Sequence, residues 1–266
     1  MSPSTSATPP LPERFRGAAV IGGTHGLGRA LARTARDRGL HTVVYGRTAE
    51  TLSDDGLHPR HLDLCDPHSV RDTPVDVPSP CYVLWVAGAF LKKTLADTTE
   101  DEVEQLTRLM FTGPVLFLRR LLAAVEEPVH LITVASSSAW KRRERESLYC
   151  GLKAAQATIV RNLVPELRAA HPENRITLIN PGGLAVPDFH TGLALDFGAM
   201  MDPDHVARII WDIAADQRRT FTEVQILRSR EPGSEGTPEV SYGARTPQAP
   251  EEPGTATAPP APTPHP

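Results

Sequence analysis

Tyr149 and Lys153 are the pair of residues whose types and spacing point most directly to chemistry. They stand four positions apart, and on a helix this spacing places both side chains on one face. An ammonium group beside a phenol favours the phenolate and lowers the tyrosine pKa, so the hydroxyl can exchange a proton with a substrate oxygen near neutral pH. The chain has only four tyrosines and four lysines, so chance predicts about 0.06 such pairs. We therefore predict an acid–base pair at these two positions.

A run of three serines precedes this pair and follows directly after an apolar run, Val129–Ala135. The run comprises Ser136, Ser137 and Ser138. A serine hydroxyl at the end of a strand can hold the substrate oxygen on which charge develops. We expect one of these hydroxyls to act together with the tyrosine.

The loop Gly22–Gly28 follows the first apolar run, Gly17–Ile21, and precedes a helical pattern. Its glycines have the spacing G-x-x-x-G-x-G, and they allow the backbone to turn tightly and to approach a phosphate closely. The amide groups at the start of the following helix would face that phosphate. The loop residues predicted to contact a dinucleotide are Gly22, Thr24, His25, Gly26, Leu27 and Gly28.

Arg47 follows the second apolar run, His41–Tyr45, at a place where a site for NAD usually carries a carboxylate. No carboxylate stands there, and a guanidinium group can bind a ribose 2′-phosphate with two hydrogen bonds. His25 could add a second donor. The cofactor predicted from these residues is NADP(H).

Short apolar runs alternate with helical patterns between residues 17 and 228. The predicted strands are Gly17–Ile21, His41–Tyr45, Arg60–Leu64, Tyr82–Ala87, Val129–Ala135, Arg175–Asn180 and Thr220–Leu227. Helices are expected from Leu27, from Thr99 to Val125 with a bend at Pro114, from Ser147 to Ala170 with an interruption at Pro165, and from Asp202. This alternation predicts an α/β fold, namely a doubly wound, mostly parallel sheet of about seven strands with helices on both faces. In such a sheet, ligands bind beyond the carboxyl ends of the strands.

These motifs together resemble the short-chain dehydrogenase/reductase family over roughly residues 15–228. The glycine loop, the Tyr-x-x-x-Lys spacing, Ala87-Gly88 and Pro181-Gly182 all match motifs of that family. The resemblance implies Tyr149 and Lys153 as catalytic residues. We assign Ser137 as the catalytic serine by strand alignment, with Ser136, reached by counting back from the tyrosine, as the alternative. The cofactor-binding residues predicted outside the glycine loop are Arg47, Thr48, Asp63, Leu64, Ala87, Gly88, Tyr149, Lys153, Pro181, Gly182 and Leu184.

The sequence departs from the family pattern in the long helix before the tyrosine. The family commonly has a catalytic asparagine there, which sustains a water relay to the lysine, and this position corresponds to Met110. A thioether cannot anchor a chain of water molecules as a carboxamide can. The departure puts the usual proton relay in question and leaves the Ser-Tyr-Lys set intact.

Two further segments are open to two interpretations each. The segment Trp140–Arg145 is either a solvated basic loop or the receiver of an anionic or large polar substrate, with Trp140 as an apolar wall. The segment Gly183–Met201 corresponds to the family's substrate-covering segment, and it either lines an apolar pocket or merely covers the sheet.

Composition bounds the remaining possibilities. Of the 26 prolines, four fall in residues 1–12 and ten in residues 231–266, so we expect disordered tails at 1–12 and 231–266 around a single domain at 13–230. The net charge of −4 gives no reason to expect a nucleic acid or a membrane as partner. No apolar run is long enough to span a bilayer, and no secretory signal is recognised. Three cysteines without metal or redox spacing are typical of free thiols in the cytoplasm and predict no metal site.

The function predicted from the sequence is reduction of a carbonyl of a small organic substrate by hydride transfer from NADP(H), with Tyr149 as the proton donor. Two alternatives are an enzyme that uses the same site for dehydration, isomerisation or epimerisation, and a non-catalytic protein that senses NADP(H). The family resemblance implies a homodimer or homotetramer.

Overall fold

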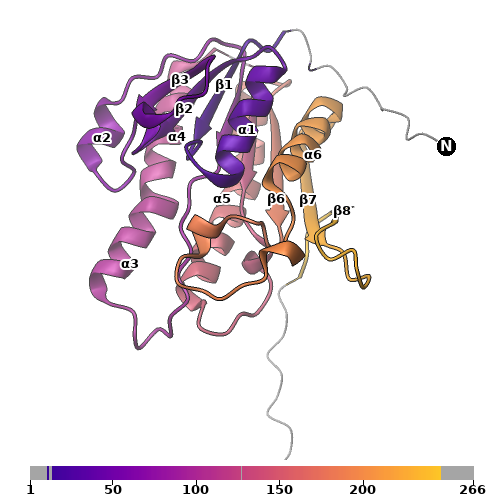
Figure 1. Ribbon diagram of the computed structural model, residues 1–266. Helices are drawn as coiled ribbons and strands as arrows, with labels where there is room; N and C mark the ends of the chain where they lie inside the picture. The colour runs from indigo at the N-terminus through magenta and orange to yellow at the C-terminus, as the bar shows by residue number, and fades with distance from the viewer. Residues whose placement is uncertain (1–10, 12–13, 127, 247–266) are drawn as a thin grey trace, which may run out of the picture.

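The computed structural model describes residue 11 and residues 14–126 and 128–246. Within them the chain forms one eight-stranded sheet with the strand order β3-β2-β1-β4-β5-β6-β7-β8 (Figure 1). The strands are β1 Gly17–Ile21, β2 His41–Gly46, β3 Leu57–His61, β4 Cys81–Trp85, β5 Val129–Val134, β6 Arg175–Pro181, β7 Phe221–Arg228 and β8 Pro238–Tyr242. Pairing is parallel from β3 to β7, and β8 is antiparallel to β7. The predicted doubly wound sheet is therefore confirmed, with eight strands.

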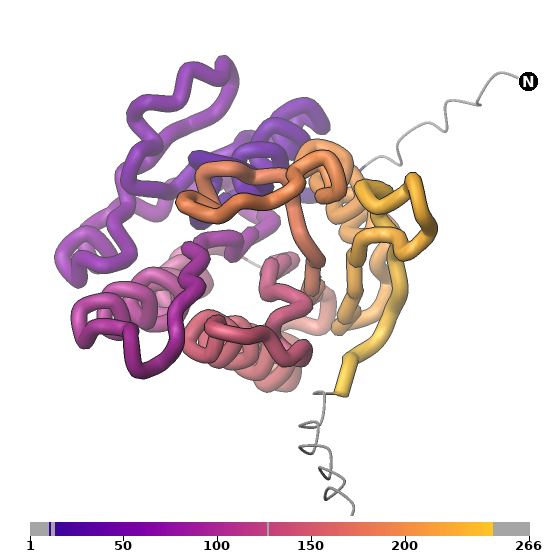
Figure 2. The backbone as a smooth tube through the Cα atoms, turned by 60° about the horizontal axis from the view of Figure 1, so that its bottom comes forward, coloured from indigo at the N-terminus to yellow at the C-terminus, as the bar shows by residue number. Residues whose placement is uncertain are grey.

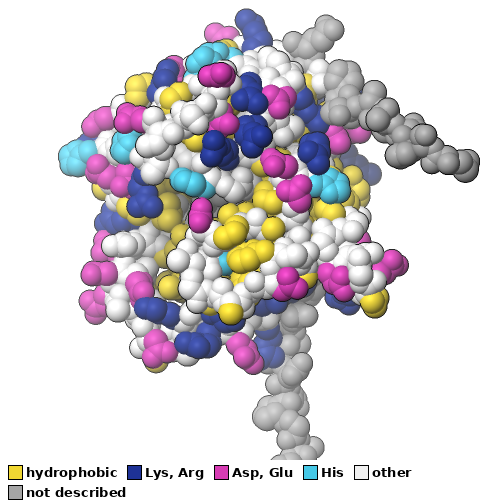
Figure 3. All heavy atoms as spheres, in the orientation of Figure 1, with side chains coloured by type: hydrophobic (Ala, Val, Ile, Leu, Met, Phe, Trp, Pro, Cys, Tyr) yellow, Lys and Arg dark blue, Asp and Glu magenta, His cyan; other side chains and the backbone are white. Residues whose placement is uncertain are grey.

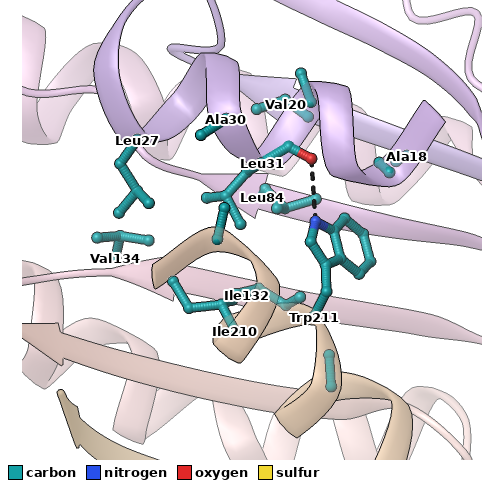
Figure 4. Packing of buried hydrophobic residues seen from close by; sticks show 14 of the residues in the cluster. Ala18, Val20, Leu27, Ala30, Leu31, Leu84, Ile132, Val134, Ile210 and Trp211 are labelled. Carbon is teal, nitrogen blue, oxygen red and sulfur yellow. Dashed lines mark hydrogen bonds between the residues drawn. The ribbon is translucent and has the colours of Figure 1, made fainter. Parts of the chain in front are cut away.

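Helices cover both faces of this sheet. They are α1 Gly26–Asp37, α2 Pro67–Asp72, α3 Glu100–Thr107, α4 Gly113–Ala124, α5 Ser147–Ala170 and α6 Pro203–Asp216. One face packs against α1 and α6, where the indole nitrogen of Trp211 donates to the carbonyl of Leu31 at 3.0 Å (Figure 4). The other face packs against α4 and α5, around side chains such as Phe117 and Val160. The central strands β1, β4 and β5 are buried throughout, because their side chains point alternately into these two layers.

A predicted strand and two predicted helices differ from the structure. The third strand is Leu57–His61 and not Arg60–Leu64. The prediction included Leu62 and Leu64 because they are apolar. They lie in the loop after the strand, and their side chains are buried against the helical layer. Ser147–Ala170 continues through Pro165 without a break.

The predicted helix from Thr99 to Val125 is divided. A π-helical turn, Arg108–Thr112, separates α3 from α4 and lies directly before Pro114. Proline has no N–H, so it cannot donate to the carbonyl of Met110, four residues earlier. The irregularity therefore falls on the N-terminal side of the proline.

The C-terminal boundary is also different from the prediction. Residues 238–242, which we expected within a disordered tail, form β8 and pair with β7 from Val224 to Arg228. An edge strand whose side chains are all exposed or half-buried gives little apolar signal, and the proline-rich composition of the segment conceals it. Of the expected tails at 1–12 and 231–266, residues 1–10, 12 and 247–266 lie outside the described residues.

None of the helices in the described part of the chain is both long enough and apolar enough to cross a lipid bilayer.

Candidate active site

The carboxyl ends of the parallel strands open into one cleft with a volume of about 1090 Å³. Figure 2 turns this edge of the sheet toward the viewer, with the orange segment between β6 and α6 across from the start of α5. The predicted site residues that line the cleft are Gly22, Thr24, His25, Gly26, Leu27, Gly28, Arg47, Thr48, Leu64, Ala87, Gly88, Ser136, Ser137, Tyr149, Lys153, Pro181, Gly182 and Leu184. Residues from six loops thus meet in one place.

Asp63 is a predicted site residue that does not line the cleft. Its Oδ1 accepts a hydrogen bond from the backbone N–H of Cys65 at 2.8 Å. Its own backbone N–H donates to the Ser69 hydroxyl at 2.9 Å. The carboxylate therefore stabilises the turn before α2, and its contact with the cofactor stays a prediction.

The glycine loop forms a cradle that side chains would fill. Gly22 has φ of +87°, and a Cβ there would lie 2.5 Å from the Cα of Ala87. A Cβ on Gly28 would lie 2.0 Å from the carbonyl oxygen of Gly22. The N-cap residue of α1, His25, makes no side-chain hydrogen bond to the helix amides. The start of α1 is therefore close to the loop backbone and open to an anion.

Arg47 lies at the end of β2, exposed and on the wall of the same cleft. Within the described residues it forms no ion pair. His25 lies on the same wall and its Nδ1 is 2.9 Å from the Thr24 hydroxyl. A guanidinium without a carboxylate partner beside an open helix start is suited to a phosphate group.

Tyr149 and Ser136 are joined at the other end of the cleft. The Tyr149 side chain is buried on the first turns of α5, and the Ser136 hydroxyl bonds to it from the end of β5. Ser136 also accepts from the backbone N–H of Ser138 at 3.0 Å. Ser137 lies on the cleft wall and makes no bond to the tyrosine. Ser136, the alternative reached by counting back from the tyrosine, is therefore the serine whose hydrogen bond acts on the pKa of Tyr149, and the choice of catalytic serine stays a prediction.

Burial controls the ionisation of this pair. It raises the pKa of Tyr149 above its ordinary value, and the hydrogen bond from Ser136 opposes that rise. It lowers the pKa of Lys153 to about 7. Lys153 Nζ donates to the carbonyl of Val134 at 3.2 Å and lies 5.9 Å from the centre of the Tyr149 ring. The expected lowering of the tyrosine pKa is not found, because burial of the phenol is the largest influence on that pKa and raises it.

Met110, which the sequence predicts at the position of the family's relay asparagine, has a fully buried side chain. Its backbone carbonyl accepts a hydrogen bond of 2.6 Å from Nε2 of Gln156, one turn beyond Lys153 on α5. Oε1 of Gln156 is buried without a partner among the described residues. The Met110 carbonyl, to which Pro114 cannot donate, therefore accepts its hydrogen bond from the Gln156 side chain.

Aromatic side chains enclose the tyrosine. The ring of Phe90 meets the Tyr149 ring edge-on, with centroids 5.0 Å apart. Phe189 contributes a ring centred 6.4 Å from Tyr149, and His190 lies beside Phe90 at 5.4 Å. Hydrophobic side chains gather over the segment between β6 and α6 on the face shown in Figure 3. This part of the cleft offers an apolar surface around the buried hydroxyl of Tyr149.

Sequence reasoning missed several residues of this site. Phe90 follows the Ala-Gly motif closely, and its proximity to a strand end was the available signal. Phe189 lies in the segment Gly183–Met201, for which lining a pocket was one of the two interpretations, and it does line the cleft. Arg228 was missed, and it reaches the cleft from the end of β7. Gln156 could have been found, since it lies three residues from Lys153 on the same helix.

Within residues 14–126 and 128–246, no group of three or more His, Cys, Asp or Glu side chains could hold a metal ion.

Comparison with known sequences gives a family and distant relatives. The family described as short chain dehydrogenase matches residues 16–192. An uncharacterized oxidoreductase of Staphylococcus aureus strain MW2 is 27% identical over 179 residues, which cover 62% of this chain and 76% of that protein.

Comparison with solved structures gives the same fold. A short-chain dehydrogenase/reductase from Vibrio parahaemolyticus is similar with a TM-score of 0.68 and 22% identity, over 80% of this chain and 97% of that one. An alcohol dehydrogenase from the archaeon Thermococcus sibiricus, complexed with 5-hydroxy-NADP, has a TM-score of 0.62 and 21% identity over 79% and 95% of the two chains. A 3-ketoacyl-(acyl-carrier-protein) reductase from Brucella melitensis, complexed with NADH, has a TM-score of 0.65 and 17% identity over 79% and 96%.

Proposed function

The chain belongs to the short-chain dehydrogenase/reductase family, and from that premise we propose that it is an NADP(H)-dependent oxidoreductase that reduces a carbonyl of a small organic substrate. One observation carries the proposal: a buried tyrosine hydroxyl, bonded to a serine and followed one turn later by a buried lysine, lines the same cleft as an open glycine loop. Burial keeps Tyr149 protonated at neutral pH. That is the state required of a proton donor to a carbonyl oxygen.

The residues present fit a dinucleotide with a 2′-phosphate. The glycine cradle has no room for Cβ atoms, the amides at the start of α1 are not capped by His25, and Arg47 has no ion pair within the described residues. Gly22–Gly28 would hold the pyrophosphate, and Arg47 with His25 the 2′-phosphate. When bound, the nicotinamide supplies the hydride.

The chain's own residues then handle the carbonyl oxygen. Ser136 and Tyr149 would both donate hydrogen bonds to it, and Tyr149 would transfer its proton as negative charge develops there. The ammonium form of Lys153 would stabilise the phenolate left behind. Phe90 and Phe189 exclude water from this hydroxyl.

A second candidate is non-redox chemistry at the same site, such as dehydration, isomerisation or epimerisation. It is favoured by the buried Met110 side chain at the relay position and by the engagement of its carbonyl with Gln156. The two functions are separated by following nicotinamide absorbance and product together. Product formed with no net change in absorbance would support the second candidate.

The cofactor preference is tested with Arg47→Gln. We expect the dissociation constant of NADPH to rise about tenfold or more, because a charge-assisted hydrogen bond to phosphate contributes roughly 1.5–3 kcal/mol. The dissociation constant of NADH should change little, since NADH has no 2′-phosphate. Both are measured by cofactor fluorescence, with Arg119→Gln, an exposed arginine outside the cleft, as control. Equal weakening of both cofactors would contradict the assignment.

A further inference from the structure

Five basic side chains, here named the basic cluster, come from three segments at one side of the cleft. They are Lys141, Arg143, Arg228, Arg230 and Arg245. Arg143 and Arg228 line the cleft itself. Burial lowers the pKa of Lys141, and the neighbouring arginines, Arg143 first, lower it further. The four guanidinium groups therefore act on one ammonium group and concentrate positive charge beside the substrate end of the cleft.

One buried amide holds these segments together. Gln225, fully buried on β7, accepts from the indole N–H of Trp140 at 3.2 Å. Its Nε2 donates to the carbonyl of Gly243 at 3.0 Å, two residues before Arg245. The ammonium group of Lys141 lies 5.0 Å from the centre of the Trp140 ring. The loop before α5, the end of β7 and the residues after β8 are thus fixed to one another, so the proximity of the charges is built into the fold.

Glu146 places a carboxylate beside the cluster, since it lines the cleft and interacts with Arg143. Among the described residues, no member of the cluster takes part in an ion pair. Arg228 donates to the carbonyl of Ala199 at 2.9 Å and Arg245 to the hydroxyl of Ser241 at 3.2 Å, and both acceptors are uncharged. Like charges held together repel one another, so an arrangement that keeps them close is suited to an anionic ligand.

We propose that the basic cluster binds a phosphate-bearing, polyanionic end of the substrate, while the reacting carbonyl lies at Tyr149. The proposal rests on the proposed function and specifies its substrate class. Guanidinium groups match phosphate oxygens with paired hydrogen bonds. Four guanidinium groups and one ammonium group exceed what a single carboxylate would neutralise, and they lie at the opposite end of the sheet from Arg47. The cluster is therefore a second anion site, separate from that of the cofactor.

Trp140 provides a direct signal for this site. The other two tryptophans, Trp85 and Trp211, are buried in the core. The full chain, saturated with NADP⁺, is titrated with inorganic pyrophosphate while tryptophan fluorescence is recorded, and Trp140→Phe identifies the source of the signal. We expect saturable binding, weakened about tenfold or more in the triple variant Lys141→Gln/Arg143→Gln/Arg228→Gln, because several charged hydrogen bonds are lost.

The matched control is Arg33→Gln/Arg119→Gln/Arg208→Gln, which removes the same charge from exposed positions away from the cleft. It should bind pyrophosphate as the unmodified chain does. Equal affinity in the cluster variant would overturn the proposal, and so would weakening of the same size in the control. Tricarballylate binding as tightly as pyrophosphate would overturn the phosphate class. The pyrophosphate titration is repeated on Arg47→Gln in the absence of NADP⁺. If the cluster binds pyrophosphate there as in the unmodified chain, this proposal holds even where the proposed binding of NADP⁺ fails, so the two failures can be told apart.

Discussion

Burial and the hydrogen bond from Ser136 act in opposite directions on the pKa of Tyr149, and Nζ of Lys153 lies 5.9 Å from the centre of its ring. Burial is the largest influence on that pKa, and it keeps the phenol protonated. The sequence correctly brought these three side chains together, because their spacing after a strand and along a helix is local. It could not predict the direction of the pKa shift, since burial depends on Phe90 and Phe189, which come from other loops.

The two serines make a direct test at this scale. We expect Ser136→Ala to lower kcat/KM by about 100-fold, the effect of removing one donor to a developing oxyanion. Ser137→Ala, the matched control on the same wall, should lower it by less than about tenfold. Steady-state kinetics, with melting temperatures to confirm folding, measure both. A larger loss for Ser137→Ala would reverse the assignment.

Lys153 makes the stability of the protein depend on pH. Its pKa falls from the ordinary value of 10.5 to about 7 on folding, so between these values the unfolded chain binds more protons, and stability rises with pH. Lys153→Met should raise the free energy of unfolding at pH 7, on the order of 2–4 kcal/mol, and the gain should shrink toward pH 10. Urea unfolding at both pH values checks this, with exposed Lys92→Met as control. A gain that is the same at pH 7 and pH 10 would contradict the burial account.

At the scale of elements, the junction between α3 and α4 shows how one proline is compensated. Pro114 leaves the carbonyl of Met110 without its helical donor, and Gln156 of α5 supplies one. The sequence predicted an irregularity here, and its form depends on a neighbouring helix. The misplaced third strand has a similar cause, because its boundary is set by pairing with β2 and not by the apolar residues that follow.

A double-mutant cycle tests this compensation. Gln156→Leu should lower the free energy of unfolding by about 1–2 kcal/mol, since it leaves a buried carbonyl unpaired. Pro114→Ala restores a backbone N–H, so in that background the same change should cost about 1 kcal/mol less. Urea unfolding of the four proteins gives the coupling. Strictly additive effects would show that Gln156 does not stand in for the missing donor.

At the scale of the whole molecule, the sheet, its helical layers and the place of the cleft were predictable from the sequence. Strand ends in a parallel sheet converge, so motifs after β1, β2, β4, β5 and β6 had to meet. β8 was not predictable in this way, because an exposed edge strand in a proline-rich segment has little apolar pattern. Its pairing with β7, and the bond from Gln225 to Gly243, hold residues 238–243 at the β7 edge of the sheet.

The most direct test of the account is transfer of deuterium from NADPH labelled at nicotinamide C4 into alcohol products of a ketone panel. The unmodified chain should transfer the label. Tyr149→Phe should transfer it about 100-fold to 10,000-fold more slowly, as expected for loss of a general acid. Its NADPH affinity should be kept, and Tyr242→Phe, an exposed tyrosine outside the cleft, should be unaffected. Transfer by Tyr149→Phe at the unmodified rate would contradict the central claim.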